Sequence, residues 1–244
     1  MRTKVVATVG PASATPDTVL ALARTGVDVF RLNFAHGTHE SHARVIRWVR
    51  EAGRLTGKPL AILADLAGPK IRIGSLPEPV ELIEGANVVI APEDIASDDE
   101  LPTTYHALSD DVAPGDRLLL DDGLLELRVE DVRQPRVLAR VVRGGILKSN
   151  KGINLPGVRV SAPALTEKDL DDLEFLVDAG VDYIALSFVQ RPDDIYALRA
   201  RIPRRLLVVA KIEKDTALEN LEEILAASDA VMVARGDLGV ELPF

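Results

Sequence analysis

The sequence predicts an α/β fold: a partial (β/α)8 barrel of the TIM type, with about six of its eight strands, interrupted by a small β-barrel domain. Two observations predict this fold. In residues 1–68 and 161–244, short apolar runs alternate with helical segments, which is typical of parallel β/α units. In residues 69–160 the helical periodicity disappears, and short Val, Leu and Ile runs alternate with turn signals. We therefore expect a barrel domain in two parts, with an inserted domain between them.

The first barrel part is expected to contain strands and helices in alternation. Its strands are the apolar runs at residues 5–9, 27–32 and 60–65. Thr15 and Thr38 are suited to cap helices, because a hydroxyl oxygen accepts a hydrogen bond from a free backbone N–H. A first helix is therefore predicted from Pro16 to just before Gly26, and a second over about residues 39–56.

Elements of the inserted segment and of the second barrel part are predicted from the same kinds of signal. Turn signals rich in Gly, Pro and Asp separate the apolar runs of the insertion, at residues 113–116, 121–123, 134–135 and 144–145. After it, strands are predicted at residues 182–186, 206–212 and 230–234, and helices at 166–180, 191–201 and 215–227. Residues 26–34 and 180–188 share Gly, Val, Asp, Leu and Phe at equivalent positions, which favours a fold built from repeated units.

Composition excludes several classes of protein. The chain has 244 residues, a net charge of -9, 47% hydrophobic residues and no cysteine. The acidity argues against a nucleic-acid partner, and the missing cysteine excludes disulfides, thiolate metal sites and cysteine nucleophiles. No apolar run reaches the length of a membrane span, and the N-terminus lacks the pattern of a secretory signal. We expect a cytoplasmic protein with no membrane partner.

Charged and polar side chains lie at the carboxyl ends of the predicted strands. Lys211 and Glu213 end the run at residues 206–212 and, at positions i and i+2, share one face. Arg31 and Asn33 end an earlier strand in the same way. The carboxyl ends of barrel strands meet at one rim, where the active sites of such barrels lie. A cation beside an anion at this rim favours a site for a metal ion and a phosphate group.

Asp65 ends the third strand, and Asp237 follows the last one. Each feature alone has an ordinary explanation, as a solvated ion pair or a turn. Together at consecutive strand ends they indicate phosphoryl chemistry.

Segments in order along the whole chain resemble the N-terminal half of the pyruvate kinase family. They are TKVVATVGPAS at residues 3–13, RLNFAHG at 31–37, DLAGPKIR at 65–72, NKGINLPG at 150–157, AKIE at 210–213 and MVARGDLGVE at 232–241. The resemblance implies an enzyme of glycolysis that moves the phosphoryl group of phosphoenolpyruvate to ADP, giving pyruvate and ATP. It also implies a barrel interrupted by a mobile lid domain.

The resemblance implies roles for individual residues. Lys211 looks like the catalytic lysine, which also contacts the substrate, and Arg72 like a second catalytic residue. Arg31 and the backbone N–H groups of Gly236 and Asp237 are expected to bind phosphoenolpyruvate. The nucleotide is expected to contact the residues that match the family's nucleotide-side positions: Asn33, His36 and the lid residue Lys151.

Two metal sites follow from the same resemblance. Glu213 and Asp237 are similar to the carboxylates that hold Mg²⁺ (or Mn²⁺), a hard ion that prefers oxygen ligands. Asn33, Asp65 and Leu66 match ligands of the K⁺ that most of the family binds. Two residues depart from that pattern: Ala35 stands where a serine oxygen is expected, and Lys70 stands where K⁺-requiring members have glutamate. We therefore predict that K⁺ is not required.

Two alternatives remain open at this stage. One is another Mg²⁺-dependent barrel enzyme that acts on pyruvate or its enolate, although such an enzyme needs no nucleotide lid. The other is a non-catalytic fragment that binds nucleotide or a protein partner. The family continues with further β/α units, which include a catalytic threonine, and with a C-terminal domain. We thus expect this chain to be a truncated form with uncertain activity on its own, and a homo-oligomer (a tetramer) only for the full-length form.

Overall fold

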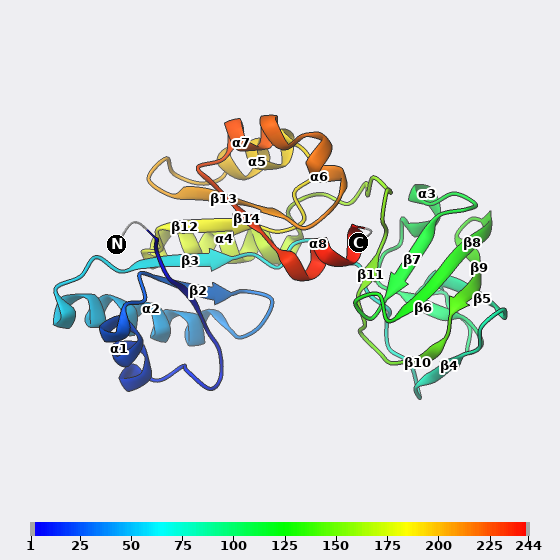
Figure 1. Ribbon diagram of the computed structural model, residues 1–244, viewed down its shortest axis with the longest axis horizontal. Helices are drawn as coiled ribbons and strands as arrows, with labels where there is room; N and C mark the ends of the chain where they lie inside the picture. The colour runs from blue at the N-terminus through cyan, green and yellow to red at the C-terminus, as the bar shows by residue number, and fades with distance from the viewer. Residues whose placement is uncertain (1–2, 243–244) are drawn as a thin grey trace. The chain divides into compact units, whose positions relative to one another are not determined.

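The computed structural model describes residues 3–242 and divides into two compact units, each described here by itself (Figure 1). The first, called the barrel unit, contains Met1–Gly68, Ala164–Lys211 and Leu221–Met232. The second, called the β unit, contains Pro69–Pro163, Ile212–Asn220 and Val233–Phe244.

The barrel unit is built on a six-stranded sheet in which the strand order follows the chain order. The strands are β1 (Val6–Val9), β2 (Val29–Asn33), β3 (Ala61–Asp65), β12 (Tyr183–Leu186), β13 (Leu207–Ile212) and β14 (Ala230–Val233). Neighbours from β1 to β13 pair in parallel, and Asn33 lies level with Asp65 in the β2–β3 register. Parallel strands in chain order, with helices between them and the inserted domain after β3, confirm the predicted partial (β/α)8 barrel.

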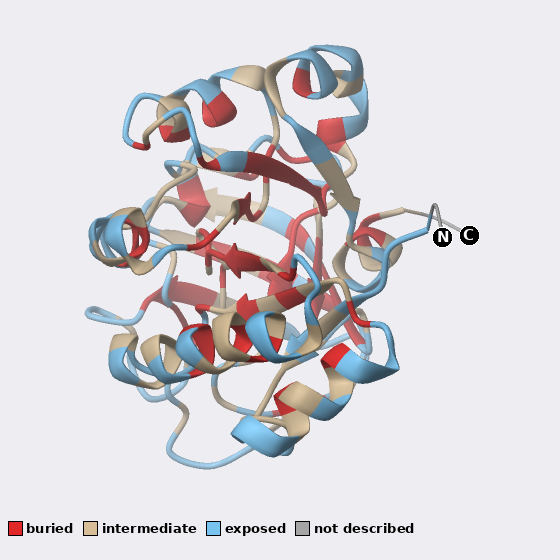
Figure 2. Cartoon of the chain, turned by 90° about the vertical axis from the view of Figure 1, so that its left-hand side faces the viewer, coloured by how far each residue is buried: buried red, intermediate tan, exposed pale blue. Residues whose placement is uncertain are grey.

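Helices alternate with these strands. They are α1 (Pro16–Thr25), α2 (His39–Thr56), α4 (Glu167–Ala179), α5 (Pro192–Arg199) and α7 (Leu221–Ala227). Thr15, Thr38 and Thr166 accept N-terminal N–H groups as caps, and α1, α2 and α4 each end at a glycine in the left-handed region. Helix α1 packs on α2, and α5 packs on α7. Figure 2 shows the strands largely buried, while the helices keep exposed outer surfaces.

The core of the barrel unit lies on both faces of its sheet. Leu63, Ala185 and Val209 come from three adjacent strands and form one buried apolar cluster, against which Val29 and Met232 pack. Alternate residues of the same strands, such as Ile62 and Ile184, are fully buried on the other face. Burial on both faces explains why these strands read as continuous apolar runs in the sequence.

The β unit contains the predicted inserted domain. Its larger sheet has the order β11-β7-β8-β9-β5-β6, and β4 pairs with β10 separately. The elements are β4 (Val80–Leu82), β5 (Asn87–Pro92), β6 (Leu101–Thr103), α3 (Leu108–Asp111), β7 (Arg117–Leu120), β8 (Leu125–Arg133), β9 (Arg136–Arg143), β10 (Gly145–Leu147) and β11 (Ile153–Asn154). Ile73 bridges to Thr103 beside one edge of the sheet, and Arg72 bridges to Gly152 beside the other. This segment joins the two edges, so the domain is a small closed barrel.

Two short helices complete the β unit: α6 (Thr216–Glu219) and α8 (Arg235–Glu241). The single helix predicted over residues 215–227 is wrong, because α6 ends at Glu219, with Asn220 as its C-cap, and α7 starts at Leu221. The Asn220 side chain donates to the backbone carbonyl of Thr216, and asparagine competes in this way with helical backbone bonds. Among the described residues, no helix is both long and apolar enough to cross a membrane.

Candidate active site

In the barrel unit, the ends of β2 and β3 are joined by an ion pair. Arg31 Nε donates to Asp65 Oδ2 at 2.7 Å, and Arg31 Nη1 donates to the hydroxyl of Thr8 on β1 at 2.9 Å. The Asp65 residue is 1% exposed, so its carboxylate depends on protein partners for solvation. The parallel register sets Asp65 level with Asn33, so Arg31 reaches diagonally to Asp65 on the adjacent strand.

Lys211, from β13, is the second cation on the same carboxylate. Its ammonium lies 3.1 Å from Asp65 Oδ1 and donates to Ser187 Oγ at 2.8 Å. Only 7% of Lys211 is exposed, so it points into the unit and not into solvent. Four side chains from four strand ends therefore meet: Arg31, Asp65, Ser187 and Lys211. We call them the Lys211 network.

Ser187 was not among the residues predicted from the sequence. Its hydroxyl donates to the backbone carbonyl of Leu66 at 2.7 Å and accepts from Lys211. The chain around it is tightly constrained: Phe188 has a φ of 55°, and a Cβ at Gly68 would lie 2.8 Å from the Ser187 Cβ. A non-glycine residue with positive φ is uncommon and often marks a functional site.

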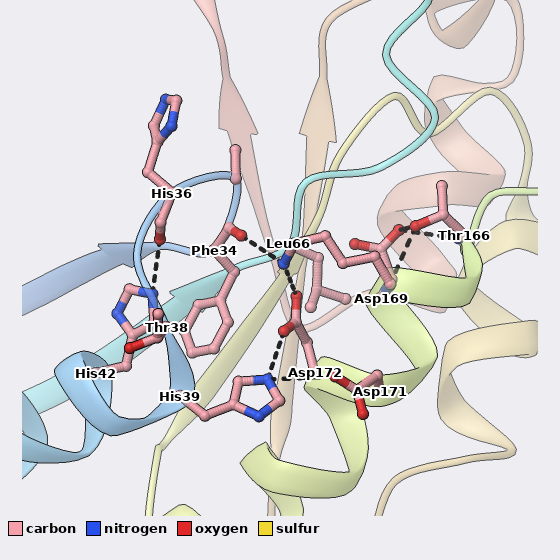
Figure 3. Close-up of polar contacts among 12 residues, drawn as sticks. Phe34, His36, Thr38, His39, His42, Leu66, Thr166, Asp169, Asp171 and Asp172 are labelled. Carbon is pink, nitrogen blue, oxygen red and sulfur yellow. Dashed lines mark hydrogen bonds and ion pairs between the residues drawn. The ribbon is translucent and has the colours of Figure 1, made fainter. Parts of the chain in front are cut away.

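The loop between β2 and α2 is held by two histidines and an aromatic ring. His42 on α2 bonds through Nε2 to the carbonyl of His36 at 2.9 Å, and its ring stacks on Phe34 with centroids 4.1 Å apart (Figure 3). Burial lowers the pKa of His42 from 6.5, which favours the neutral ring. A neutral ring that donates through Nε2 leaves Nδ1 as an acceptor.

A second set of contacts ties this loop to α4. His39 Nε2 lies 2.7 Å from Asp172 Oδ1, and Lys168 donates both to Asp172 Oδ2 at 2.6 Å and to the Phe34 carbonyl at 2.8 Å. Figure 3 shows His39 on α2 and Asp172 on α4 pointing toward each other. His39, Asp171 and Asp172 lie close enough to share a metal ion, but the Lys168 ammonium already occupies the Asp172 carboxylate. The group is a structural clamp on the loop.

A cavity of about 350 Å³ lies beside this loop in the barrel unit. Its wall includes Pro11 from the β1–α1 loop, Asn33 and His36 after β2, and Val45 and Trp48 from α2. The lining is mainly apolar with a few polar groups, which is the usual character of a small-molecule site. Asn33 and His36, two of the predicted nucleotide-binding residues, thus line the same cavity. Trp48 was not predicted as a site residue.

The remaining predicted residues belong to the β unit. Lys70 donates to Asp237 Oδ1 at 2.9 Å, while Glu213 is 2% exposed. Arg72 Nη1 donates to the carbonyl of Asn150 at 3.0 Å. Lys151, beside Asn150 in the sequence, pairs with Asp121 at 2.7 Å. Asp237 lies in the first turn of α8, next to Gly236.

The β unit also contains a buried ion pair that was not predicted. Lys214 and Glu241 are 6% and 3% exposed, and the Lys214 Nζ lies 3.5 Å from Glu241 Oε1. Asn154 donates to the same oxygen at 3.1 Å. Among the described atoms, Glu241 Oε2 has no hydrogen-bond partner. Burial raises the pKa of Glu241 above 4.5, and the nearby Lys214 opposes that shift. We call this group the Lys214 pair.

Comparison with known proteins identifies the family. The family model described as the barrel domain of pyruvate kinase matches residues 1–244. Pyruvate kinase of Corynebacterium glutamicum is 49% identical over 247 residues, covering 99% of this chain and 52% of that relative. Pyruvate kinase of Mycobacterium tuberculosis is 48% identical with the same coverage, and that of Geobacillus stearothermophilus is 44% identical over 250 residues, or 43% of its length. The chain spans about half the length of these curated relatives. It belongs to the pyruvate kinase family.

Proposed function

We propose that the protein transfers the phosphoryl group of phosphoenolpyruvate to ADP, giving pyruvate and ATP. The observation that supports this most directly is the Lys211 network. A buried ammonium, held by a carboxylate and a hydroxyl at the carboxyl ends of parallel strands, suits the stabilisation of a phosphoryl group in transfer. Family membership makes phosphoryl transfer the leading interpretation of that network.

Lys211 would stabilise negative charge on the phosphoryl oxygens as the group leaves the enol oxygen. Its contacts with Asp65 and Ser187 fix the ammonium, so little reorganisation is needed during the reaction. Arg31, whose guanidinium also holds Asp65, would bind phosphate oxygens with its remaining N–H groups. Arg72, Gly236 and Asp237, in the β unit, keep the substrate-binding and catalytic roles that the family resemblance implies.

Glu213 and Asp237 would hold the divalent cation. Both offer carboxylate oxygens, the donors that Mg²⁺ prefers, and Glu213 is too deeply buried for water to solvate its charge, so the donor set fits the ion. When bound, the ion would neutralise charge on the substrate oxygens. The Lys70 ammonium on Asp237 would then have to yield or share that carboxylate.

Contacts of the residues expected to bind K⁺ support the proposal that this ion is not held here. Asn33 Oδ1 already accepts the N–H of Ala35 at 3.0 Å, and the Leu66 carbonyl accepts the Ser187 hydroxyl at 2.7 Å. The Asp65 carboxylate already faces two cations. We therefore propose that turnover does not require K⁺.

The cavity beside α2 would receive the nucleoside of ADP. Asn33 and His36 are polar groups at the end of the cavity that lies beside β2, and the loop that bears them is clamped to α4. Lys151, in the β unit, would contact the phosphates as the lid closes and water is excluded. The cytoplasmic location and the tetramer expected for the full-length form stay predictions.

A coupled assay of ATP formation from phosphoenolpyruvate, ADP and Mg²⁺ tests the proposal. Lys211→Met is expected to lower kcat by at least 10²–10³-fold, roughly the effect of losing a preorganised charge-stabilising donor. Lys4→Met, at a side chain that is 65% exposed, is the matched control and should keep full turnover. ATP formation by Lys211→Met at the wild-type rate, or none by the wild-type protein, would refute the proposal.

The K⁺ proposal has its own test. Replacing K⁺ by a large inert cation should leave turnover within about twofold. Lys70 stands where K⁺-requiring members have glutamate, and its like charge would disfavour K⁺ by several kcal/mol at about 4 Å and intermediate dielectric. Lys70→Glu should introduce K⁺ dependence, and Lys70→Arg should not. A several-fold loss of wild-type turnover without K⁺ would overturn this part alone.

A further inference from the structure

One wall of the cavity in the barrel unit runs along α2. Ser41, Val45 and Trp48 line it at positions i, i+4 and i+7, so they form one stripe of the helix. The stripe extends roughly 10 Å from Ser41 to Trp48 at about 1.5 Å per residue. It starts beside the loop that bears Asn33 and His36 and leads away from the strand ends.

Polar groups that could contact phosphates lie at the strand-end side of this cavity. Asn33, His36 and Ser41 supply polar groups next to the strand ends, where the phosphate chemistry is proposed. Farther along the helix, Val45 and Trp48 supply apolar surface beside Arg44, while Val9 and Leu32 also line the cavity at the strand ends. A nucleotide has charged phosphates at one end and a base with flat π-faces at the other. With its phosphates at the polar groups beside the strand ends, its base would lie toward Trp48.

Trp48 is the aromatic residue suited to that end. Trp48 lines the cavity and is only partly buried, so it keeps surface that a ligand could contact. His42 also lines the cavity, but its ring is already stacked on Phe34. Arg44, a third wall residue, already pairs with Glu40 at 2.9 Å.

We infer that Trp48 binds the base of the nucleotide by stacking, which makes it a specificity-determining residue for base-containing acceptors over inorganic phosphates. The inference rests on the proposed function and names a contact within the same nucleotide site. Base–aromatic stacking tolerates different bases, since each base has a π-face. Trp48 thus selects for the presence of a base and discriminates weakly between bases.

The chain has one tryptophan, so its intrinsic fluorescence reports on Trp48 alone. Titration with MgADP is expected to change this fluorescence saturably, and titration with Mg-pyrophosphate, which lacks a base, should not. Trp48→Leu should weaken ADP binding, measured by calorimetry, about 10-fold, the size typical of losing one base stack. Trp48→Phe should recover binding to within about threefold, because it restores an aromatic face. Pyrophosphate binding should be equal in all variants.

Leu55→Ala is the matched control, since Leu55 is 61% exposed on the same helix and is not part of the cavity wall. In the coupled assay, Trp48→Leu should raise the KM for ADP about 10-fold with kcat unchanged, the signature of lost uniform binding. If Trp48→Leu does not fold, the fluorescence titration of the wild-type protein and the ADP affinity of Trp48→Phe still test the inference.

The outcomes separate this inference from the proposed function. Turnover with an unchanged KM for ADP in Trp48→Leu overturns the inference and leaves the function intact. An ADP-dependent fluorescence change without turnover overturns the function and keeps Trp48 as a nucleotide contact. ADP binding with no fluorescence change, or no ADP binding at all, overturns the inference.

Discussion

Lys211 and Lys214 are buried cations only three positions apart in the sequence, yet their surroundings differ. In the barrel unit, Lys211 shares Asp65 with Arg31 and also donates to Ser187. In the β unit, Lys214 faces Glu241 at 3.5 Å, and one oxygen of Glu241 has no partner among the described atoms. Both oxygens of the Asp65 carboxylate thus contact cationic side chains, whereas only one oxygen of Glu241 has a partner among the described atoms.

The difference teaches that buried charge is not by itself a measure of stability. A carboxylate removed from water loses hydration that only close, well-directed partners can replace. Asp65 has two cations at 2.7 and 3.1 Å, whereas Glu241 has one amide at 3.1 Å and one more distant ammonium. We expect the Lys211 network to hold its unit together and the Lys214 pair to contribute little.

The largest predicted effect is that of Asp65→Asn. The amide keeps the size of the side chain but leaves Arg31 and Lys211 facing each other without an anion. Breaking a buried ion pair in this way costs about 3–5 kcal/mol. Urea denaturation should therefore show a large fall in the free energy of unfolding of the barrel unit.

The matched control for Asp65→Asn is Glu40→Gln, the same chemical change in a side chain that is 84% exposed and paired with Arg44. An exposed i,i+4 pair contributes about 0.3–0.5 kcal/mol, so the control should be nearly neutral. Equal losses in the two variants would contradict the view that Asp65 anchors the network.

The Lys214 pair is predicted to respond in the same direction but more weakly. Burial raises the Glu241 pKa, so the folded state disfavours the charged form despite Lys214. Glu241→Gln keeps an acceptor for Asn154 and removes the charge. It also leaves the buried Lys214 ammonium without its anion, so at pH 7 it should lower the free energy of unfolding, but by less than about 1.5 kcal/mol because the pair is long, at 3.5 Å.

The pH dependence checks the sign of the Glu241 pKa shift. Because the folded state binds the Glu241 proton more tightly than the unfolded chain does, the stabilisation from that proton is complete below about pH 4.5. It is lost as the pH rises through the folded-state pKa. The stability of Glu241→Gln relative to wild type should thus rise between pH 4 and pH 7, and a constant difference would show that the charge is not responsible.

Much of the barrel unit could be predicted from the sequence because its signals are local. Thr38 caps α2, and the helix ends at Thr56 before Gly57, which has a φ of 65°. Arg31, Asp65 and Lys211 could be found because a charged residue inside an apolar strand is unusual, and parallel strands bring such residues to one rim.

The features that were missed depend on contacts between distant segments. Ser187 looks like an ordinary residue at a strand end until its hydroxyl meets Lys211, 24 positions away. Trp48 lies on an amphipathic helix, where an aromatic residue usually indicates core packing. Glu241 and Lys214 are 27 positions apart, and no local pattern pairs them. One sequence signal points to Trp48. It lies seven positions after Ser41, on the same face of the helix that follows the predicted nucleotide loop.

His42 provides the smallest predicted effect and the opposite pH dependence, now in the barrel unit. Burial lowers its pKa below 6.5, so the unfolded chain binds this proton more tightly than the folded state does. Stability should be full above pH 6.5 and fall as the pH drops below it, by less than about 1 kcal/mol for this partly exposed ring.

His42→Gln, which can still donate to the His36 carbonyl, should remove this part of the pH dependence. The difference in stability between wild type and the variant separates the contribution of His42 from that of His39, which contacts Asp172. Urea midpoints at pH 5.5 and pH 7.5 measure it; if the variant loses as much stability as wild type on acidification, the acid-sensitive group of the barrel unit lies elsewhere, and the contrast with Glu241 fails.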